Sequence, residues 1–171
     1  MEVLIMKARK RDSEAFIELM DLNMQYMYKI AKSYLKVDAD VADAVQDTIL
    51  TCYEKIGTLK QNQYFKTWLT RILINKCKDI LRRNKDMYIG AEIPEIPVRD
   101  YHYDNLEWKQ VLQSLNEKYR TILLLYYLEE FNTREIAEIL DMNEKTVQTR
   151  LARGRSKISE VYHMEARRDD L

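Results

Sequence analysis

The chain has 171 residues, of which 46% are hydrophobic and 33% charged, and its 28 Lys and Arg balance its 28 Asp and Glu. This composition excludes a disordered chain, and apolar runs such as Thr121–Leu128 are far shorter than the ~20 residues that span a bilayer. The first residues lack the architecture of a signal peptide. We therefore expect a soluble, cytoplasmic protein of one medium or two small domains.

Charge is unevenly distributed along the chain although it cancels overall. Residues 1–86 contain sixteen Lys and Arg against twelve Asp and Glu, residues 87–104 one against four, and residues 105–171 eleven against twelve. The three glycines and two prolines of the whole chain favour long helices. Local clusters of like charge, rather than the net charge, therefore indicate the partners.

Helical spacing of apolar residues predicts a first helix that begins near Asp12 or Ser13, either of which can cap it, and ends at the stretch KVDAD. A second helix is then predicted from Asp38 or Asp40, one of which would be its N-cap, to about Ile56. A loop is expected at residues 57–63.

The second helix carries an acidic face, formed by Asp40, Asp43 and Asp47. Three carboxylates on one face could bind a divalent metal ion, but no histidine or further acid converges on them, and no metal site is predicted. The simplest interpretation is a solvated face. The functional alternative is a docking surface for a basic partner helix.

A third helix, predicted from Phe65 to about Asn84, contains the stretch FKTWLTRILINKCKDILRR, which has six cations and a single acid. At 100° per residue, four of its polar residues form one stripe: Arg71, Asn75, Lys78 and Arg82. Thr67 lies on the same face and Trp68 borders it. A cationic stripe can follow a phosphate backbone, an aromatic ring can stack on an unpaired base, and Asn75 could bind a base edge. A solvated amphipathic helix is the alternative.

The best candidate for a linker is residues 87–104, which contain both prolines and no helical periodicity. It would join a domain of residues 1–86 to one of residues 105–171. Helices are predicted in the second domain at about residues 105–115, 117–129, 133–140 and 143–163. No alternation typical of a strand occurs, so we predict an all-α protein of two small helical domains joined by an irregular acidic linker.

The last two predicted helices have the pattern of a helix-turn-helix. A tight turn at residues 141–143 separates them, and Asp141 stands where a left-handed backbone is expected, a conformation that Asp tolerates. Val147, Leu151, Gly154 and Ile158 form a narrow apolar seam. The segment from residue 145 to 159 has five cations and no acid, as expected of a recognition helix in the major groove.

Candidate DNA-binding residues on this helix divide into two groups. Three long cations suit phosphates: Arg150, Arg153 and Lys157. Residues near the start of the helix suit base edges: Lys145, Thr146, Gln148 and Thr149. A plain helical hairpin with a basic outer face is the alternative.

Nothing in the chain indicates catalysis. There is no G-x-S-x-G and no phosphate-binding loop, and His102 and His163 lack metal-ligand spacing. Cys52 and Cys77 form no C-x-x-C pair and are expected to be small buried hydrophobes. We predict no catalytic residue, no cofactor and no small-molecule substrate.

Three blocks of the chain, in order, resemble the extracytoplasmic-function (ECF) group of bacterial sigma factors, which direct RNA polymerase to promoters. DADVADAVQDTILTCYEKI resembles the polymerase-docking helix of that family and FKTWLTRILINKCKDILRR its promoter-melting, −10-reading helix. The stretch from LNEKYRTILLL to LARGRSKI resembles its −35-reading domain. The family usually has glycine where this chain has Asp141.

The resemblance implies a role for each group of residues. Asp43, Gln46 and Asp47 would bind the clamp coiled coil of core RNA polymerase. Arg71 and the basic residues after it would hold the melted non-template strand of promoter DNA, with Asn75 and the loop of residues 59–64 beside a flipped −10 base. The linker would run toward the RNA exit path. A further partner would be an anti-sigma factor, often membrane-anchored.

Two other interpretations are compatible with the residues alone. A stand-alone helix-turn-helix regulator would bind duplex DNA without polymerase, as a dimer on a palindrome. A helical adaptor that binds only protein would use the acidic face, but it leaves the cations of the last helix without a role.

Overall fold

The computed structural model describes residues 1–87 and 115–166, with side chains described for residues 1–84 and 115–160. Every regular element in these ranges is helical. The chain divides into two compact units, residues 1–98 and 99–171. Residues 88–114 lie outside the described residues. They include all of the predicted linker (residues 87–104) except residue 87, and all of the predicted helix at residues 105–115 except residue 115.

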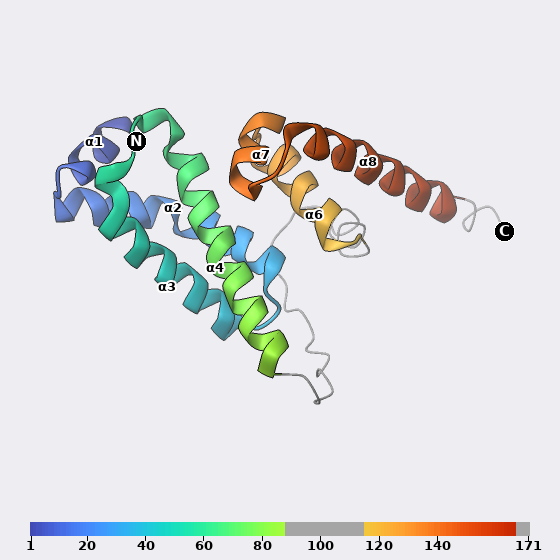
Figure 1. Ribbon diagram of the computed structural model, residues 1–171, viewed down its shortest axis with the longest axis horizontal. Helices are drawn as coiled ribbons and strands as arrows, with labels where there is room; N and C mark the ends of the chain where they lie inside the picture. The colour runs from blue at the N-terminus through green and yellow to red at the C-terminus, as the bar shows by residue number, and fades with distance from the viewer. Residues whose placement is uncertain (88–114, 167–171) are drawn as a thin grey trace. The chain divides into compact units, whose positions relative to one another are not determined.

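In its described residues, 1–87, the N-terminal unit contains four α-helices: α1 (Glu2–Arg9), α2 (Ser13–Tyr34), α3 (Asp38–Lys55) and α4 (Phe65–Met87). The helices α2, α3 and α4 pack against one another, and α1 lies on α2 (Figure 1). Two 3-10 turns, η1 (Ile56–Thr58) and η2 (Asn62–Tyr64), occupy the predicted loop between α3 and α4. The shared core consists of side chains with at most 1% exposure, among them Leu19, Met27, Val41, Cys52, Leu69, Leu73 and Cys77.

Helix α1 was not predicted from the sequence. Only Ile5 and Ala8 of this helix are buried, whereas Val3 and Met6 are exposed, so its apolar residues do not mark one face. The prediction for α2 is confirmed, because the carboxylate of Asp12 accepts a hydrogen bond of 3.0 Å from the backbone N–H of Ala15.

The predicted cap of α3 is wrong. The N-cap position is Val37, which provides no side-chain hydrogen bond, and Asp38 is the first helical residue. Asp38 instead forms an ion pair with Lys32 near the end of α2. Asp40 accepts a hydrogen bond of 2.9 Å from the amide of Asn84 on α4. Both carboxylates therefore join neighbouring helices, an arrangement that depends on packing and not on local sequence.

Both cysteines are free and fully buried in the N-terminal unit. Burial raises the pKa of Cys52 to about 12. Burial likewise raises the pKa of Cys77 to about 12, against a smaller opposing effect of a backbone hydrogen bond. Both side chains are therefore neutral thiols at physiological pH, as expected of small core hydrophobes.

In its described part, the C-terminal unit contains α6 (Glu117–Leu123), η3 (Leu124–Leu128), α7 (Thr133–Leu140) and α8 (Glu144–Ala166). The helix predicted at residues 117–129 is thus α-helical only in its first half, and η3 is a π-helical turn. The α7 prediction matches at both ends. A capping box between Asn132 and Glu135 explains where α7 begins.

The turn between α7 and α8 has the predicted left-handed residue. Asp141 adopts φ 54° and ψ 54°, and the N–H of Met142 bonds the carbonyl of Ala137 at 3.0 Å. Reversal of the chain at this point allows α8 to pack against both α6 and α7 (Figure 1).

Candidate nucleic-acid interface

The seam predicted on α8 holds this helix in place. Val147 and Leu151 are 0% and 4% exposed, and Ile158 is half-buried. A Cβ atom on Gly154 would lie only 3.0 Å from the Cδ1 of Leu123 on α6. Glycine therefore permits a close approach of α6 and α8, which fixes the outer face of α8 relative to α6.

A hydrogen bond also joins the first residues of the two helices of the motif. The hydroxyl of Thr133, at the start of α7, donates to the carboxylate of Glu144, at the start of α8, at 2.6 Å. The side chain of Asn143 accepts from the backbone N–H of Lys145 at 2.8 Å. The first turn of α8 is thus held in position by contacts within the chain.

The outer face of α8 is accessible at every predicted position. Five of these residues are exposed: Lys145, Gln148, Thr149, Arg153 and Lys157. The other two, Thr146 and Arg150, are half-buried. The face is therefore open to a ligand.

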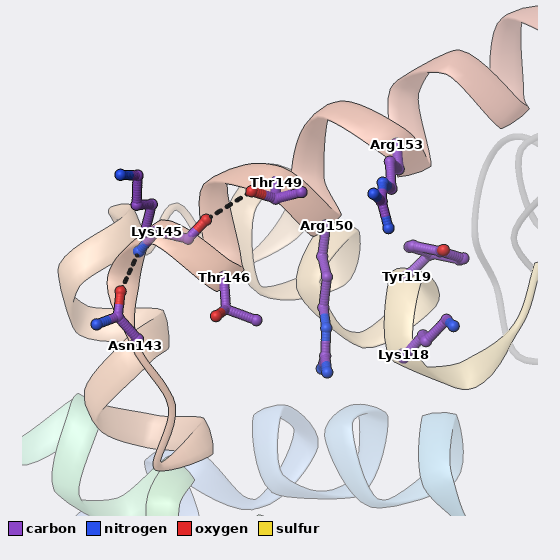
Figure 2. A pocket seen from close by; sticks show the side chains of 8 residues that line it. All are labelled: Lys118, Tyr119, Asn143, Lys145, Thr146, Thr149, Arg150 and Arg153. Carbon is purple, nitrogen blue, oxygen red and sulfur yellow. Dashed lines mark hydrogen bonds between the residues drawn. The ribbon is translucent and has the colours of Figure 1, made fainter.

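This face borders an open hollow of about 540 Å³. Its lining has four cations and no acid: Lys118, Tyr119, Asn143, Lys145, Thr146, Thr149, Arg150 and Arg153. Figure 2 shows the side chain of Arg153 extending from α8 toward the first turn of α6, where Lys118 and Tyr119 lie. Arg150 extends from the same helix, with its Nη1 3.9 Å from the sulfur of Met142. A concave surface of one charge concentrates a polyanion.

Sequence reasoning missed the contribution of α6. Lys118 and Tyr119 stand 26 and 25 positions before Glu144, the first residue of the recognition helix, in a segment otherwise dominated by apolar residues. The ammonium of Lys118 lies 5.0 Å from the centroid of the Tyr119 ring, a distance typical of a cation–π contact. The local signal was a cation and an aromatic residue in the first turn of α6, which becomes informative only once α8 is packed beside it.

Hydrogen bonds within α8 limit what its polar side chains can offer. The hydroxyl of Thr149 donates to the carbonyl of Lys145 at 2.8 Å, so this side chain can offer a ligand only the acceptor lone pairs of its oxygen and its methyl group. The amide of Gln148 contacts Glu144 at 3.5 Å, which is a weak hydrogen bond. Gln148 can exchange that partner for a base edge at little cost.

One cation of α8 is excluded from this face. Arg155 donates a 2.6 Å hydrogen bond from Nε to the hydroxyl of Tyr127, and its guanidinium lies 5.4 and 5.5 Å from the ring centroids of Tyr126 and Tyr127. Arg155 therefore braces η3 against α8. It was not among the predicted DNA-binding residues.

The stripe predicted on α4 is accessible along its length. Arg71, Asn75 and Arg82 are exposed, and Lys78 is half-buried. Arg82 forms a 2.7 Å ion pair with Asp79 in which both side chains are more than half exposed. Such a pair contributes roughly 0–1 kcal/mol, so a phosphate could replace Asp79.

Two predictions next to this stripe need qualification. Thr67 is 7% exposed, and its placement on the open face was wrong, because α2 covers the first turns of α4 where the hydroxyls of Tyr26 and Thr70 hydrogen-bond. Trp68 is half-buried, and its ring centroid lies 6.2 Å from that of Phe65. Part of the indole surface is therefore used in packing.

The predicted docking residues lie together on the open face of α3. Asp43, Gln46 and Asp47 are all exposed, unlike Asp40, which is tied to α4. Leu50 continues the same face one turn later and is 56% exposed. Single exposed apolar side chains are common on protein surfaces, so the exposure of Asp43, Gln46 and Asp47 is what their predicted docking role requires.

Two negative findings apply to the described residues. Residues 1–87 and 115–166 contain no helix whose length and hydropathy would allow it to cross a membrane. Within the same ranges, no three His, Cys, Asp or Glu side chains are grouped so that they could hold a metal ion.

Comparison with known families gives two matches. A model described as Sigma-70 region 2 matches residues 19–86, and one described as Sigma-70, region 4 matches residues 105–158. The first range contains α3 and α4 with their exposed stripes, and the second contains the helix-turn-helix.

Individual proteins agree with these matches. The chain is 30% identical to the ECF RNA polymerase sigma factor SigW of Bacillus subtilis (strain 168), over 92% of this chain and 96% of that protein. It is also 30% identical to the RNA polymerase sigma factor SigV of the same organism, over 87% of this chain and 92% of that protein.

Two solved structures have a similar fold, each at 23% identity. One is CnrH in complex with the cytosolic domain of CnrY, with a TM-score of 0.70 over 95% of this chain and 97% of that one. The other is the sigma factor RpoE in complex with the anti-sigma factor NepR from Bartonella quintana, with a TM-score of 0.73 over 86% and 96%. From its sequence relatives and the two matched regions, the chain belongs to the ECF family of RNA polymerase sigma factors.

Proposed function

We propose that this sigma factor reads the −35 element of its promoters as duplex with the outer face of α8 and holds the melted −10 element against α4. The observation that carries this proposal is the hollow beside α8, which four cations and no acid line. A lining of this charge on a recognition helix suits the phosphate backbone of duplex DNA.

At the −35 element, the two groups of residues on α8 have different tasks. Arg150, Arg153 and Lys157 bind phosphates and set the position of the helix in the groove. Base edges are read by the residues of the first two turns: Lys145, Thr146, Gln148 and Thr149. Lys118 adds a further phosphate contact from α6.

At the −10 element, α4 stabilises separated strands. Arg71, Lys78 and Arg82 follow the backbone of the non-template strand, and Asn75 lies among them with an exposed amide that can bond a base edge. Unstacking a base costs a few kcal/mol, which contacts in a pocket offset. The segment of residues 59–64 forms part of that pocket, and Trp68 supports it from its packed position beside Phe65.

The chain reaches promoters only as part of a complex with polymerase. Asp43, Gln46 and Asp47 dock on the basic clamp coiled coil of the core enzyme, with Leu50 as an apolar contact within the charged surface. This docking is non-covalent, and the chain itself performs no catalysis.

Regulation by an anti-sigma factor is part of the same proposal. NepR, found in complex with RpoE, a sigma factor of similar fold, is an anti-sigma factor. We extend this kind of partner to the present chain, which would be held inactive in the cytoplasm until a signal releases it.

Transcription from a promoter library tests the proposal directly. Core RNA polymerase is supplied with and without the purified chain, and new start sites are mapped. We expect starts that share two upstream elements spaced like −35 and −10. No new starts together with tight duplex binding by the chain alone would instead indicate a stand-alone regulator. No starts and no DNA binding would indicate a protein-only adaptor.

A further inference from the structure

Two arginines of the N-terminal segment contact the last turn of α3 and residues 56–64, the connection between α3 and α4. Arg9, the last residue of α1, donates from Nη1 to the side-chain carbonyl of Asn62 at 2.7 Å. Arg11 donates from its two terminal nitrogens to the backbone carbonyls of Tyr53 and Glu54, at 2.7 and 3.1 Å. These contacts join residues 42 to 53 positions apart in the chain.

The contacts of Arg11 fix the point at which α3 ends. The last carbonyls of a helix have no partner within the helix, and a cation there also complements the helix dipole. Arg11 supplies both the hydrogen-bond donors for these carbonyls and the positive charge. Its guanidinium also lies 5.8 Å from the centroid of the Tyr53 ring. The ring of Phe16 on α2 packs edge-on against Tyr53 from 5.2 Å. Arg11 itself adopts a left-handed backbone, with a φ of 70°, in the turn between α1 and α2.

Helix α1 also touches the middle of the connection. It packs against both η1 and η2, and a Cβ atom on Gly57 would lie 3.8 Å from the carbonyl oxygen of Arg9. Ile56 and Leu59 are buried beneath the segment. Five side chains of the segment remain exposed: Thr58, Lys60, Gln61, Gln63 and Tyr64. The backbone is therefore anchored, and it presents these polar side chains outward.

We infer that α1 positions the base-reading segment of the −10 pocket, and that Arg9 is a residue that sets −10 base preference without touching DNA. This inference rests on the proposed function of residues 59–64. Helix α1 lies outside residues 19–86, the range that the Sigma-70 region 2 model matches, so the role is an addition to that region. A pocket discriminates between bases only if its walls keep their place, and the side chain of Arg9 ties α1 to the segment through its hydrogen bond to Asn62.

The test compares Arg9→Ala with Lys7→Ala, which removes the same charge from an exposed position of α1, and with Arg9→Lys, which retains a donor. Each full-length variant is combined with core polymerase on a promoter library with a fixed −35 element and a randomised −10 element. For Arg9→Ala we expect the preference ratio at one −10 position to fall by about tenfold, the effect of losing one hydrogen bond from a charged donor. Lys7→Ala should keep the ratio, and Arg9→Lys should recover part of it.

Two further measurements make every outcome decisive. Amide hydrogen exchange of residues 57–64 in the free protein should rise about tenfold in Arg9→Ala, with core-polymerase affinity unchanged. A variant with Lys60, Gln61 and Gln63 all replaced by alanine reports on the segment itself. If that variant alters −10 preference and Arg9→Ala leaves preference unchanged, whatever its effect on exchange, the inference is overturned while the proposed function stands. If the triple variant leaves −10 preference intact, the pocket assignment fails and the inference fails with it.

Discussion

Replacing Arg153 by alanine should weaken −35 binding in a way that salt reveals, and Arg155 supplies the matched control. Both arginines are exposed and stand two positions apart on α8. Arg153 lines the basic hollow, whereas Arg155 is bonded to Tyr127 and lies over two tyrosine rings. Removing either one changes the net charge equally, so any difference between the variants reports the position of the charge.

The magnitude follows from the number of phosphates neutralised. Each contact to B-DNA contributes about 0.9 to the slope of log K against log salt. Between 50 and 200 mM salt, a fourfold change, the fold-loss of affinity of wild type should be roughly 3.5 times the fold-loss of Arg153→Ala. Replacing Lys118, Arg150 and Arg153 together should lower the slope by about 2.7, which corresponds to a difference of roughly 40-fold.

Fluorescence anisotropy of a labelled −35 duplex can measure these slopes, with the full chain bound to core polymerase and salt varied over this range. We expect the slope for Arg155→Ala to equal that of wild type. An unchanged slope for Arg153→Ala would assign this residue to structure. Equal losses for Arg153→Ala and Arg155→Ala would show that only the net charge matters, and would refute the geometric argument.

Three other substitutions test separate parts of the molecule. Asp43→Arg combined with Asp47→Arg should lower core-polymerase affinity at least about tenfold, since like charges would face the partner. Asp21→Arg, on α2, is the control. Retained docking by the double variant would mean that the α3 face is only a solvated surface. Asn75→Ala should change base preference at the −10 element by about 1–3 kcal/mol with polymerase affinity intact, and an equal loss of polymerase affinity would contradict the pocket assignment. Gly154→Val should lower the free energy of unfolding of the C-terminal unit by about 1–3 kcal/mol, measured in urea, because the valine side chain would collide with Leu123 on α6. A stability equal to wild type would mean that α6 and α8 can move apart without a loss of stability.

Much of the helical framework follows from periodicity. Helix α7 has both of its predicted ends, and α2 has its predicted cap at Asp12. The left-handed Asp141 was also predicted correctly, since a short turn between two amphipathic helices allows few backbone conformations. These features depend on residues within one or two helical turns of one another, which is the range that a sequence pattern describes.

The wrong predictions share a physical cause: in each case a residue's environment is set by contacts with another helix. Helix α1 was overlooked because its fit to α2 buries only two of its residues. Asp38 and Asp40 resemble caps locally, but Lys32 and Asn84 are the partners that they find in the folded unit. Thr67 belongs to the polar stripe by angle alone and is buried because α2 covers that end of α4.

The sequence by itself determined the helical class, the helix-turn-helix pattern and the exposed cations of α8, because amphipathic periodicity and turn chemistry are local properties. Tertiary structure decided how those cations are used: packing joins Lys118 of α6 to the basic hollow and places Arg155 against the tyrosines of η3. It also brings Arg9 to Asn62 across 53 residues. A side chain's partner over such a separation is set by the way helices pack, and no spacing along the chain encodes it.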